Sequence, residues 1–455
     1  METERLAPPD VSVRALMRLA WPLYIANLAV VGNGTIDAIM AGRLSPEDMA
    51  GVAVASSVYV TIYIGFMAVL QALSPIAGHH FGARRWRSIG DDLQQALWLA
   101  ALLLPIALPI VLATGFWNRV AGLDGPVAGI TTTYLRAVAL GLPAALAMRV
   151  FVALNAAVSR PKVTMLVNLA VLALKAPLNA LFMYGWGPFE AMGGAGAGVA
   201  TAILAWVALA LNVAIWRSDR FYDRFRSGAL HGPRWSSLHE LLKLGVPIGL
   251  STLFEVTSFT FMAVLIARLG ATAVAGHQIV ANLAAILFMV PLSLGIATSV
   301  LVAQALGSGT PKSARIAARR GLRLALGIAL IVAVLLWLLR VPVVELYTRD
   351  AGVAAMALSL IGWAALFHVF DAVQGMSTFI LRGYRQTFWP MIIYGVALWA
   401  LGLGGGAWIA FEATPLGAPR GTPGFWESAT IALGIAAAAL VALAVAEANR
   451  RVREA

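Results

Sequence analysis

Three carboxylates lie inside otherwise apolar segments of this chain, where an ionisable side chain is energetically expensive. They are Asp37, Glu255 and Asp371. An acid within a bilayer rarely faces lipid, and it usually faces a water-filled cavity, an ion pathway or a buried partner. Each of the three is therefore a candidate for binding a proton or a cation.

The surroundings of Asp37 favour an ion site. Asp37 follows Pro22 by about four helical turns and has Asn33 one turn before it, next to Gly34. Proline and glycine allow a helix to bend or loosen, which frees backbone carbonyls for an ion or for water. The alternative is an acid near the outer interface that reaches the lipid headgroups.

A lysine in the middle of another apolar segment needs a counter-charge. Lys175 shares a helical face with Asn179, four residues further on. An ammonium at this depth is expensive without a partner, and Asp37 is the intramembrane acid that we identify in the N-terminal half. The sequence thus predicts a salt bridge between Lys175 and Asp37, which protonation of Asp37 would break.

The two acids of the C-terminal half could form one site. Glu255 has serines and threonines on neighbouring turns, and Asp371 has Gln374 close by. Two nearby acids can share a proton or hold one cation, such as Na⁺, between them. Alternatively, each acid forms hydrogen bonds that join helices. Gln278 and Asn282 fit either a polar cavity or helix packing.

The elements that carry these residues are predicted to be membrane-spanning helices. Of the 455 residues, 60% are hydrophobic and only 12% are charged, which is too apolar for a soluble domain. A spanning helix needs about 20 mainly apolar residues. Twelve such stretches lie near 14–40, 51–76, 91–114, 129–154, 163–185, 194–216, 240–266, 273–300, 316–340, 353–379, 388–410 and 427–448.

The positive charge of the chain follows the predicted topology. The formal net charge is +12, and most Lys and Arg residues fall in alternate loops. The positive-inside rule then puts both termini in the cytoplasm. This distribution accounts for the basic residues without nucleic acid, for which no motif is present. There is no cysteine, P-loop, HExxH or GxSxG motif, so we expect no cofactor and no catalytic activity.

An internal repeat divides the chain into two halves. Shifting the sequence by 225 residues aligns LMRLAWP (16–22) with LLKLGVP (241–247) without a gap. An even number of helices in each repeat keeps the halves parallel, related by an axis along the membrane normal. We therefore expect six-helix lobes at 1–216 and 240–455, joined by a cytoplasmic linker at 217–239. Two such lobes suit alternating access to a central cleft.

Three segments resemble one transporter family. The first helix resembles the start of MATE (multidrug and toxin extrusion) transporters, in LAWPLYIANLAVVGNGTIDAIMAGRLSPEDMAGVAVASS. Two later segments resemble the NorM branch of this family: FEVTSFTFMAVLIARLGATAVAGHQI, and LYTRD followed by FDAVQGMSTFILRGYRQT. The resemblance implies twelve helices in two lobes around a V-shaped cleft. It also implies efflux of cationic or amphipathic drugs driven by H⁺ or Na⁺, with Asp37, Glu255 and Asp371 as ion-linked acids.

Two positions depart from the NorM pattern. Phe367 stands where NorM proteins often have a tyrosine beside the cation site, and Lys175 stands where an asparagine is common. The missing hydroxyl weakens the case for Na⁺, whereas a lysine beside an aspartate suits a proton-switched salt bridge. We expect a monomeric antiporter, surrounded by lipid, in the bacterial inner membrane. The alternatives are a flippase for lipid-linked oligosaccharides and, less favoured, an intramembrane enzyme.

Overall fold

The chain is almost entirely helical. The computed structural model describes residues 10–186, 188–226, 231–413, 415 and 417–455, so part of the expected linker, 227–230, lies outside the described residues. Twelve described helices are long and apolar enough to cross a membrane. In the described part of the chain, extended pairing is limited to one isolated bridge, between Trp186 and Phe189. These observations confirm an all-α membrane protein with twelve spans.

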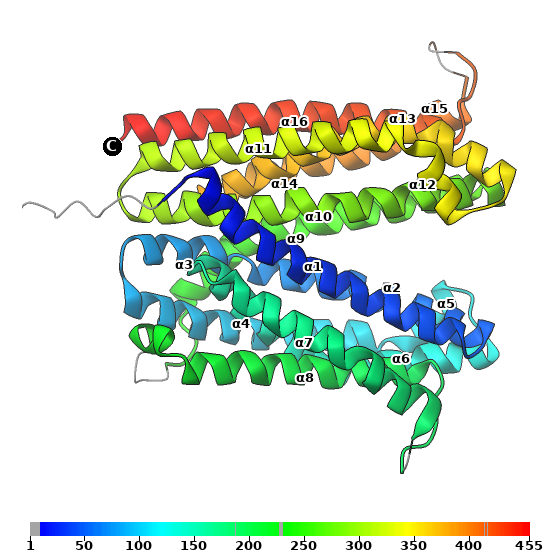
Figure 1. Ribbon diagram of the computed structural model, residues 1–455, viewed down its shortest axis with the longest axis horizontal. Coiled ribbons are helices and arrows are strands. Elements are labelled where there is room, and N and C mark those ends of the chain that lie inside the picture. Colours follow the sequence, from blue (N-terminus) through cyan, green and yellow to red (C-terminus); the bar gives the residue numbers. More distant parts are fainter. Residues whose placement is uncertain (1–9, 187, 227–230, 414, 416) are drawn as a thin grey trace, which may run out of the picture. The chain divides into compact units, whose positions relative to one another are not determined.

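Each half consists of long helices with shorter helices between them (Figure 1). The first half consists of α1 (Val13–Gly42), α2 (Pro46–Leu70), α3 (Leu73–Gly82), α4 (Trp86–Leu112), α5 (Thr114–Val120), α6 (Gly125–Ala157), α7 (Pro161–Asn179), the π-helix η1 (Ala180–Gly185), α8 (Ala195–Ser218) and the 3₁₀-helix η2 (Arg220–Phe225). The second consists of α9 (Trp235–Ala267), α10 (Ala271–Gly307), α11 (Pro311–Leu338), α12 (Arg340–Tyr347), α13 (Ala351–Gly383), α14 (Phe388–Gly395), the π-helix η3 (Val396–Gly404), α15 (Gly405–Phe411) and α16 (Thr422–Arg453).

The helix boundaries reproduce the sequence repeat. The span formed by α2 and α3 runs from Pro46 to Gly82, and α10 runs from Ala271 to Gly307, so both ends are 225 positions apart. The turn that follows each span also repeats, because Arg84 and Gly309 both have positive φ, 55° and 73°. The repeat is therefore present in backbone geometry as well as in residue identity.

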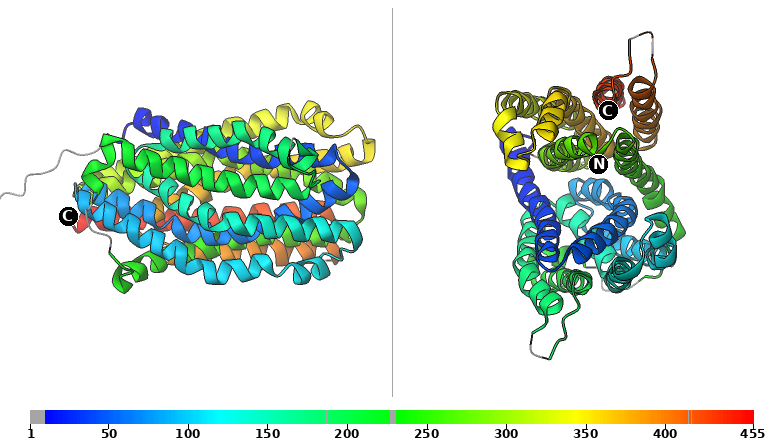
Figure 2. Two further views of the ribbon diagram at one scale, coloured as in Figure 1. Left: turned by 90° about the horizontal axis from the view of Figure 1, so that it is seen from below. Right: turned by 90° about the vertical axis from the view of Figure 1, so that its right-hand side faces the viewer.

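By packing, the chain divides into two compact units. One unit is Trp21–Gly249, and the other combines Met1–Ala20 with Leu250–Ala455. In each unit the helices run side by side in one general direction (Figure 2). The change of unit falls inside α1 and inside α9, the first helix of each repeat, rather than in the linker between the halves. The lobes expected at 1–216 and 240–455 describe the sequence repeat, and their boundaries stay a prediction.

Two glycines explain why the first half of α9 belongs to the unit Trp21–Gly249. Gly245 and Gly249 are one helical turn apart and face α2. A Cβ atom on Gly245 would lie 2.3 Å from the backbone oxygen of Val69, and one on Gly249 would lie 2.9 Å from the Val69 side chain. This small-xxx-small spacing lets helix backbones approach closely.

The start of α1 has the corresponding role in the other unit. Leu16, Leu19 and Ala20 are buried in one core cluster with Leu294 and Leu301 of α10. Each unit therefore contains the first turns of the first helix of the other repeat, held by ordinary apolar packing.

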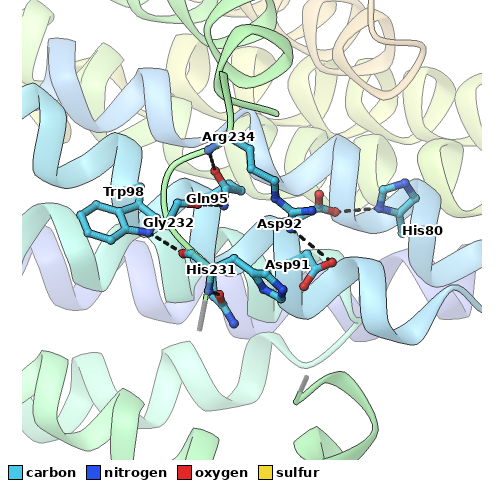
Figure 3. Close-up of polar contacts among 9 residues, drawn as sticks. His80, Asp91, Asp92, Gln95, Trp98, His231, Gly232 and Arg234 are labelled. Atoms are coloured by element: carbon cyan, nitrogen blue, oxygen red, sulfur yellow. Dashed lines mark hydrogen bonds and ion pairs between the residues drawn. The ribbon is translucent and has the colours of Figure 1, made fainter. Parts of the chain in front are cut away.

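The chain before α9 is fastened to α4 by side-chain to backbone hydrogen bonds (Figure 3). The Gln95 amide donates to the Gly232 carbonyl (3.0 Å), and its oxygen accepts from the backbone N–H of Arg234 (2.7 Å). Trp98 donates its indole N–H to the His231 carbonyl (3.0 Å). Next to these contacts, Arg234 pairs with Asp91 at 3.4 Å, and His80 of α3 contacts Asp92 at 2.7 Å.

The other end of the same connection is held at the end of α8. Asp219 accepts a hydrogen bond from the Phe221 backbone N–H (2.8 Å) and pairs with the Arg160 guanidinium. These two contacts hold the pKa of the Asp219 carboxyl below its ordinary value. The Tyr222 hydroxyl donates to the buried Asn155 side chain at 2.7 Å. Both described ends of the linker thus pack within the unit Trp21–Gly249, to which they belong.

Candidate functional site

Asp37 and Lys175 meet inside the unit Trp21–Gly249. The Lys175 Nζ atom lies 2.8 Å from Asp37 Oδ1, joining α7 to α1. Both residues are nearly inaccessible, with 2% of the surface of Lys175 and 7% of that of Asp37 exposed. The pairing expected from the sequence is present, and its role in transport stays a prediction.

Further polar groups complete this N-terminal site. The Asn179 amide donates to Asp37 Oδ1 at 2.7 Å, and Lys175 donates to the Thr201 hydroxyl at 2.6 Å. Thr201 in turn donates to the Ala197 carbonyl of its own helix, α8. Asp37 therefore accepts bonds from one cation and one neutral amide, and Lys175 has one anionic and one neutral partner. Such a network balances the two buried charges.

Two polar atoms at this level have no hydrogen-bond partner within the described chain. They are the side-chain oxygens of Asn33 and Asn179, both of which are buried. Asn33 lies one turn before Asp37 on α1, and Asn179 directly precedes the π-helix η1. Buried carbonyl oxygens without partners have a capacity to accept a donor, so the site retains unused acceptors next to the charged pair.

The C-terminal acids come together in the other unit. Glu255 and Asp371 lie close enough to interact electrostatically, as do Glu255 and Arg382. The Tyr394 hydroxyl is within hydrogen-bonding reach of Glu255. Asp371 is buried and Glu255 is half-buried. The arrangement is thus a pair of acids with an arginine and a phenol beside it.

Phe367 lies in a cluster of packed aromatic rings. Its ring makes edge-to-face contacts with Phe259 and Trp426, at centroid distances of 5.8 and 5.6 Å. Trp426 is itself held by a 3.2 Å hydrogen bond from its indole to His277. The position four residues before Asp371 therefore contributes to an apolar core and supplies no oxygen ligand.

The other polar residues singled out in the sequence have different surroundings. Gln374 is buried and donates to Thr378 at 3.3 Å, on its own helix α13. Gln278 and Asn282 are both exposed. The Asn282 side chain accepts a hydrogen bond from the Tyr347 hydroxyl at 2.9 Å. The described contacts join neither Gln278 nor Asn282 to an acid. No group of three or more His, Cys, Asp or Glu that could hold a metal ion occurs in the described ranges.

Comparison with known proteins shows the family. The MatE family model matches residues 22–181 and 247–408. The chain belongs to the MatE family. The two matched stretches correspond to the two repeats, and each begins at the proline of a first helix, Pro22 or Pro247.

The relatives extend over nearly the whole chain. A protein of Aromatoleum aromaticum named "Probable multidrug resistance protein NorM" is 41% identical over 431 residues, covering 94% of this chain and 93% of its own. A protein of the same name from Neisseria meningitidis serogroup B is 36% identical with the same coverage. The crystal structure of the eukaryotic MATE transporter AtDTX14 has the same fold, with a TM-score of 0.86, 19% identity and coverage of 97% of this chain and 98% of that one. The protein is thus a multi-pass membrane protein of the MATE fold, with bacterial relatives.

Four residues of the two sites were not anticipated from the sequence: Thr201, Tyr134, Tyr394 and Arg382. Tyr134 lies near both Asp37 and Thr201. Hydroxyl groups within helices give a weak sequence signal, because a serine or threonine can bond its own helix. Arg382 stands near the end of α13, where the sequence suggests an interfacial residue, although its Nε is buried without a partner among the described residues.

Proposed function

We propose that this protein is a secondary antiporter that exports cationic and amphipathic drugs in exchange for an ion, with H⁺ as at least part of the driving force. The observation that carries the proposal is the buried Asp37–Lys175 pair within a MATE fold. The names of the NorM relatives support drug efflux as the activity. The basic loops favour a bacterial inner-membrane location with both termini in the cytoplasm.

The N-terminal pair supports a simple exchange mechanism. When Asp37 is ionised, it can be neutralised either by Lys175 or by a cationic drug. Protonation of Asp37 removes the anion that both of them need, so the drug is released and the lysine loses its salt bridge. Asn179 and Thr201 remain as neutral partners for the two side chains in this state. Alternating access then carries the loaded and the protonated forms to opposite sides.

The C-terminal acids supply a second candidate ion site in the proposal. Two close carboxylates repel each other when both are ionised, so binding of one proton or one Na⁺ is favourable. Arg382 near Glu255 lowers the net negative charge of this site, and Phe367 provides no oxygen for Na⁺. The missing oxygen at position 367 favours H⁺ over Na⁺, because Na⁺ requires a shell of several oxygen atoms, whereas the arginine disfavours the binding of either cation.

The decisive variant is Asp37→Asn, which preserves size and removes the charge. We expect it to abolish drug efflux, because a neutral amide has no negative charge to pair with a cationic drug and does not take up or release a proton between about pH 5 and 9. The measurement is dye efflux from proteoliposomes with either a pH gradient or a Na⁺ gradient. Asp124→Asn serves as the matched control, because Asp124 is exposed before the start of α6 and its side chain makes no capping hydrogen bond. Full transport by Asp37→Asn would overturn the proposal.

The same assay separates the rival functions. A flippase for lipid-linked oligosaccharides would move a fluorescent lipid-linked sugar and ignore the ion gradients. An intramembrane enzyme would convert a substrate without moving it. Dye efflux that follows only a Na⁺ gradient would retain the antiporter and overturn the proton mechanism.

A further inference from the structure

We propose that the groove between α11, α13 and α16 binds an anionic phospholipid, with the phosphate held by Arg315 and Arg319 and an acyl chain lying along the apolar wall. The groove contains about 360 Å³ of empty space, including its open mouth. It lies within a single unit, the one that combines Met1–Ala20 with Leu250–Ala455. The site is separate from the ion sites described above and does not depend on which compound is transported.

Helical periodicity gives the groove a polar end and an apolar wall. Arg315, Arg319 and Leu322 follow at spacings of four and three along α11, and all three line the groove. Val441 and Val445 of α16 form the facing wall. From Arg315 to Leu322 the helix rises roughly 10 Å, so the charged and apolar parts are separated along the membrane normal.

The apolar wall of the groove is exposed and can bind an apolar ligand. Val445 has 47% of its surface exposed although it lies in a membrane-spanning helix. Space at the lipid-facing side of a helix bundle does not remain empty or wet, because acyl chains are the solvent there. An acyl chain is therefore the natural occupant of the part of the groove beyond the arginines.

The charge balance at the other end selects an anion. Arg315 is half-buried and donates to Asn449 at 3.2 Å, a neutral partner. Glu447, the acid nearest on α16, already pairs with Arg450 and Arg451 at 2.8 and 2.9 Å. Within the described residues, no ion pair neutralises Arg315 or Arg319, and α11 contains no acidic residue.

Position relative to the bilayer makes a phospholipid the occupant rather than a soluble anion. The arginines lie in the first turns of α11, next to the last turns of α16, where spanning helices meet the headgroup region. Juxtamembrane arginines attract anionic headgroups, each contributing about a fivefold gain in binding. A phosphate on these arginines would leave its glyceride chains beside Val441 and Val445, so one molecule satisfies both ends of the groove.

The test is photo-crosslinking of the full-length protein in nanodiscs made mostly of phosphatidylcholine. Phosphatidylglycerol with a photoactivatable acyl chain is added, and labelled peptides are mapped by mass spectrometry. We expect labelling of the 315–322 and 441–449 peptides at low lipid fractions. A photoactivatable phosphatidylcholine should label them only at much higher fractions.

Matched variants identify the contribution of each part. Arg315→Gln with Arg319→Gln should raise the phosphatidylglycerol fraction needed for half-maximal labelling about 30-fold, from about fivefold for each arginine. Lys312→Gln with Arg323→Gln removes the same charge from exposed positions of the same helix outside the groove and should leave labelling unchanged. Val445→Trp should lower labelling by filling the groove.

Several results would overturn the proposal. Equal labelling by the two lipids would show an unselective annular contact. An equal loss in the Lys312→Gln/Arg323→Gln control would show general surface charge, and cross-links to a second copy of the chain would show an interface in place of a lipid site. If the double arginine variant does not fold, Arg319→Gln alone changes an exposed side chain and should still shift labelling about fivefold.

Discussion

At the scale of single residues, the contacts that the sequence predicts best are those of buried charges, because an unpaired charge in a bilayer is energetically expensive. The pairing of Lys175 with Asp37 follows from the sequence because an isolated ammonium in a bilayer costs roughly 3 kcal/mol or more. The hydroxyl of Thr201, 2.6 Å from Lys175, does not follow from it. A threonine can satisfy its hydroxyl within its own helix, as Thr201 also does with Ala197, so nothing in its sequence context requires a distant partner.

Removal of the lysine tests the exchange mechanism directly. We expect Lys175→Ala to bind cationic drug over a wider pH range and to release it more slowly, because the drug no longer competes with an internal cation for Asp37. Drug binding and efflux measured from pH 5 to pH 9 would show the change. Lys162→Ala, a lysine near the start of the same helix, is the matched control. An unchanged pH profile in Lys175→Ala would rule out the proton-switched salt bridge.

The C-terminal acids should behave as one unit rather than two. Binding of an ion at one site typically changes the affinity for a ligand at another site about 5- to 150-fold. We therefore expect Glu255→Gln and Asp371→Asn, which each remove a ligand of the coupling ion, to lower drug efflux at least about fivefold. The double variant should then lose little more than either single variant, because the first change already removes the shared ion. Efflux rates at equal protein amounts in proteoliposomes provide the comparison. If the fold-loss of efflux in the double variant equals the product of the two single fold-losses, the two acids act at independent sites.

At the scale of helices, the sequence predicts spans well and their internal irregularities poorly. Hydropathy alone locates twelve spans, because the bilayer requires about 20 apolar residues in each. The π-helices η1 and η3 lie in the fifth span of each repeat, directly after Asn179 and close after Tyr394. A π-helix arises from local packing and not from a residue pattern, and it often accompanies functional residues. Only the structure can therefore connect these two irregular helices with the two sites.

Close helix packing at Gly245 gives a prediction at this scale. Gly245→Ala should destabilise the protein by about 1–3 kcal/mol, because the new Cβ atom would lie 2.3 Å from a backbone oxygen that cannot move aside. Gly327→Ala is the matched control, because a Cβ atom there has no neighbour within 4 Å and alanine is the better helix former. Thermal unfolding in detergent measures both variants. A Gly245→Ala protein as stable as the Gly327→Ala protein would contradict the close contact with α2.

At the scale of the whole chain, repeat and packing give different divisions. The sequence repeat indicates two halves that meet in the linker, and the helix boundaries confirm the repeat. Packing instead groups Trp235–Gly249 with the first half, through Gly245 on Val69 and through His231–Arg234 on α4. Sequence alone could not reveal this grouping, since LLKLGVPIGL is equally apolar whichever helix it packs against. Pro22 and Pro247 lie within three residues of the two changes of unit, where a helix lacks one backbone hydrogen bond.

This grouping predicts how the protein responds when it is cut in two. A chain divided between Arg226 and His231 leaves the first fragment without the turns of α9 that cover α2, and the second without the turns of α1 that bury Leu16 and Leu19. We expect neither fragment to accumulate alone, because each would expose the helix surface that is packed in the intact chain. When both are produced together, they should copurify and restore drug efflux. Gly245→Leu in the second fragment should prevent copurification, while Gly327→Leu should not, because only the first position touches another backbone. A first fragment that is stable and monodisperse on its own would contradict the shared packing.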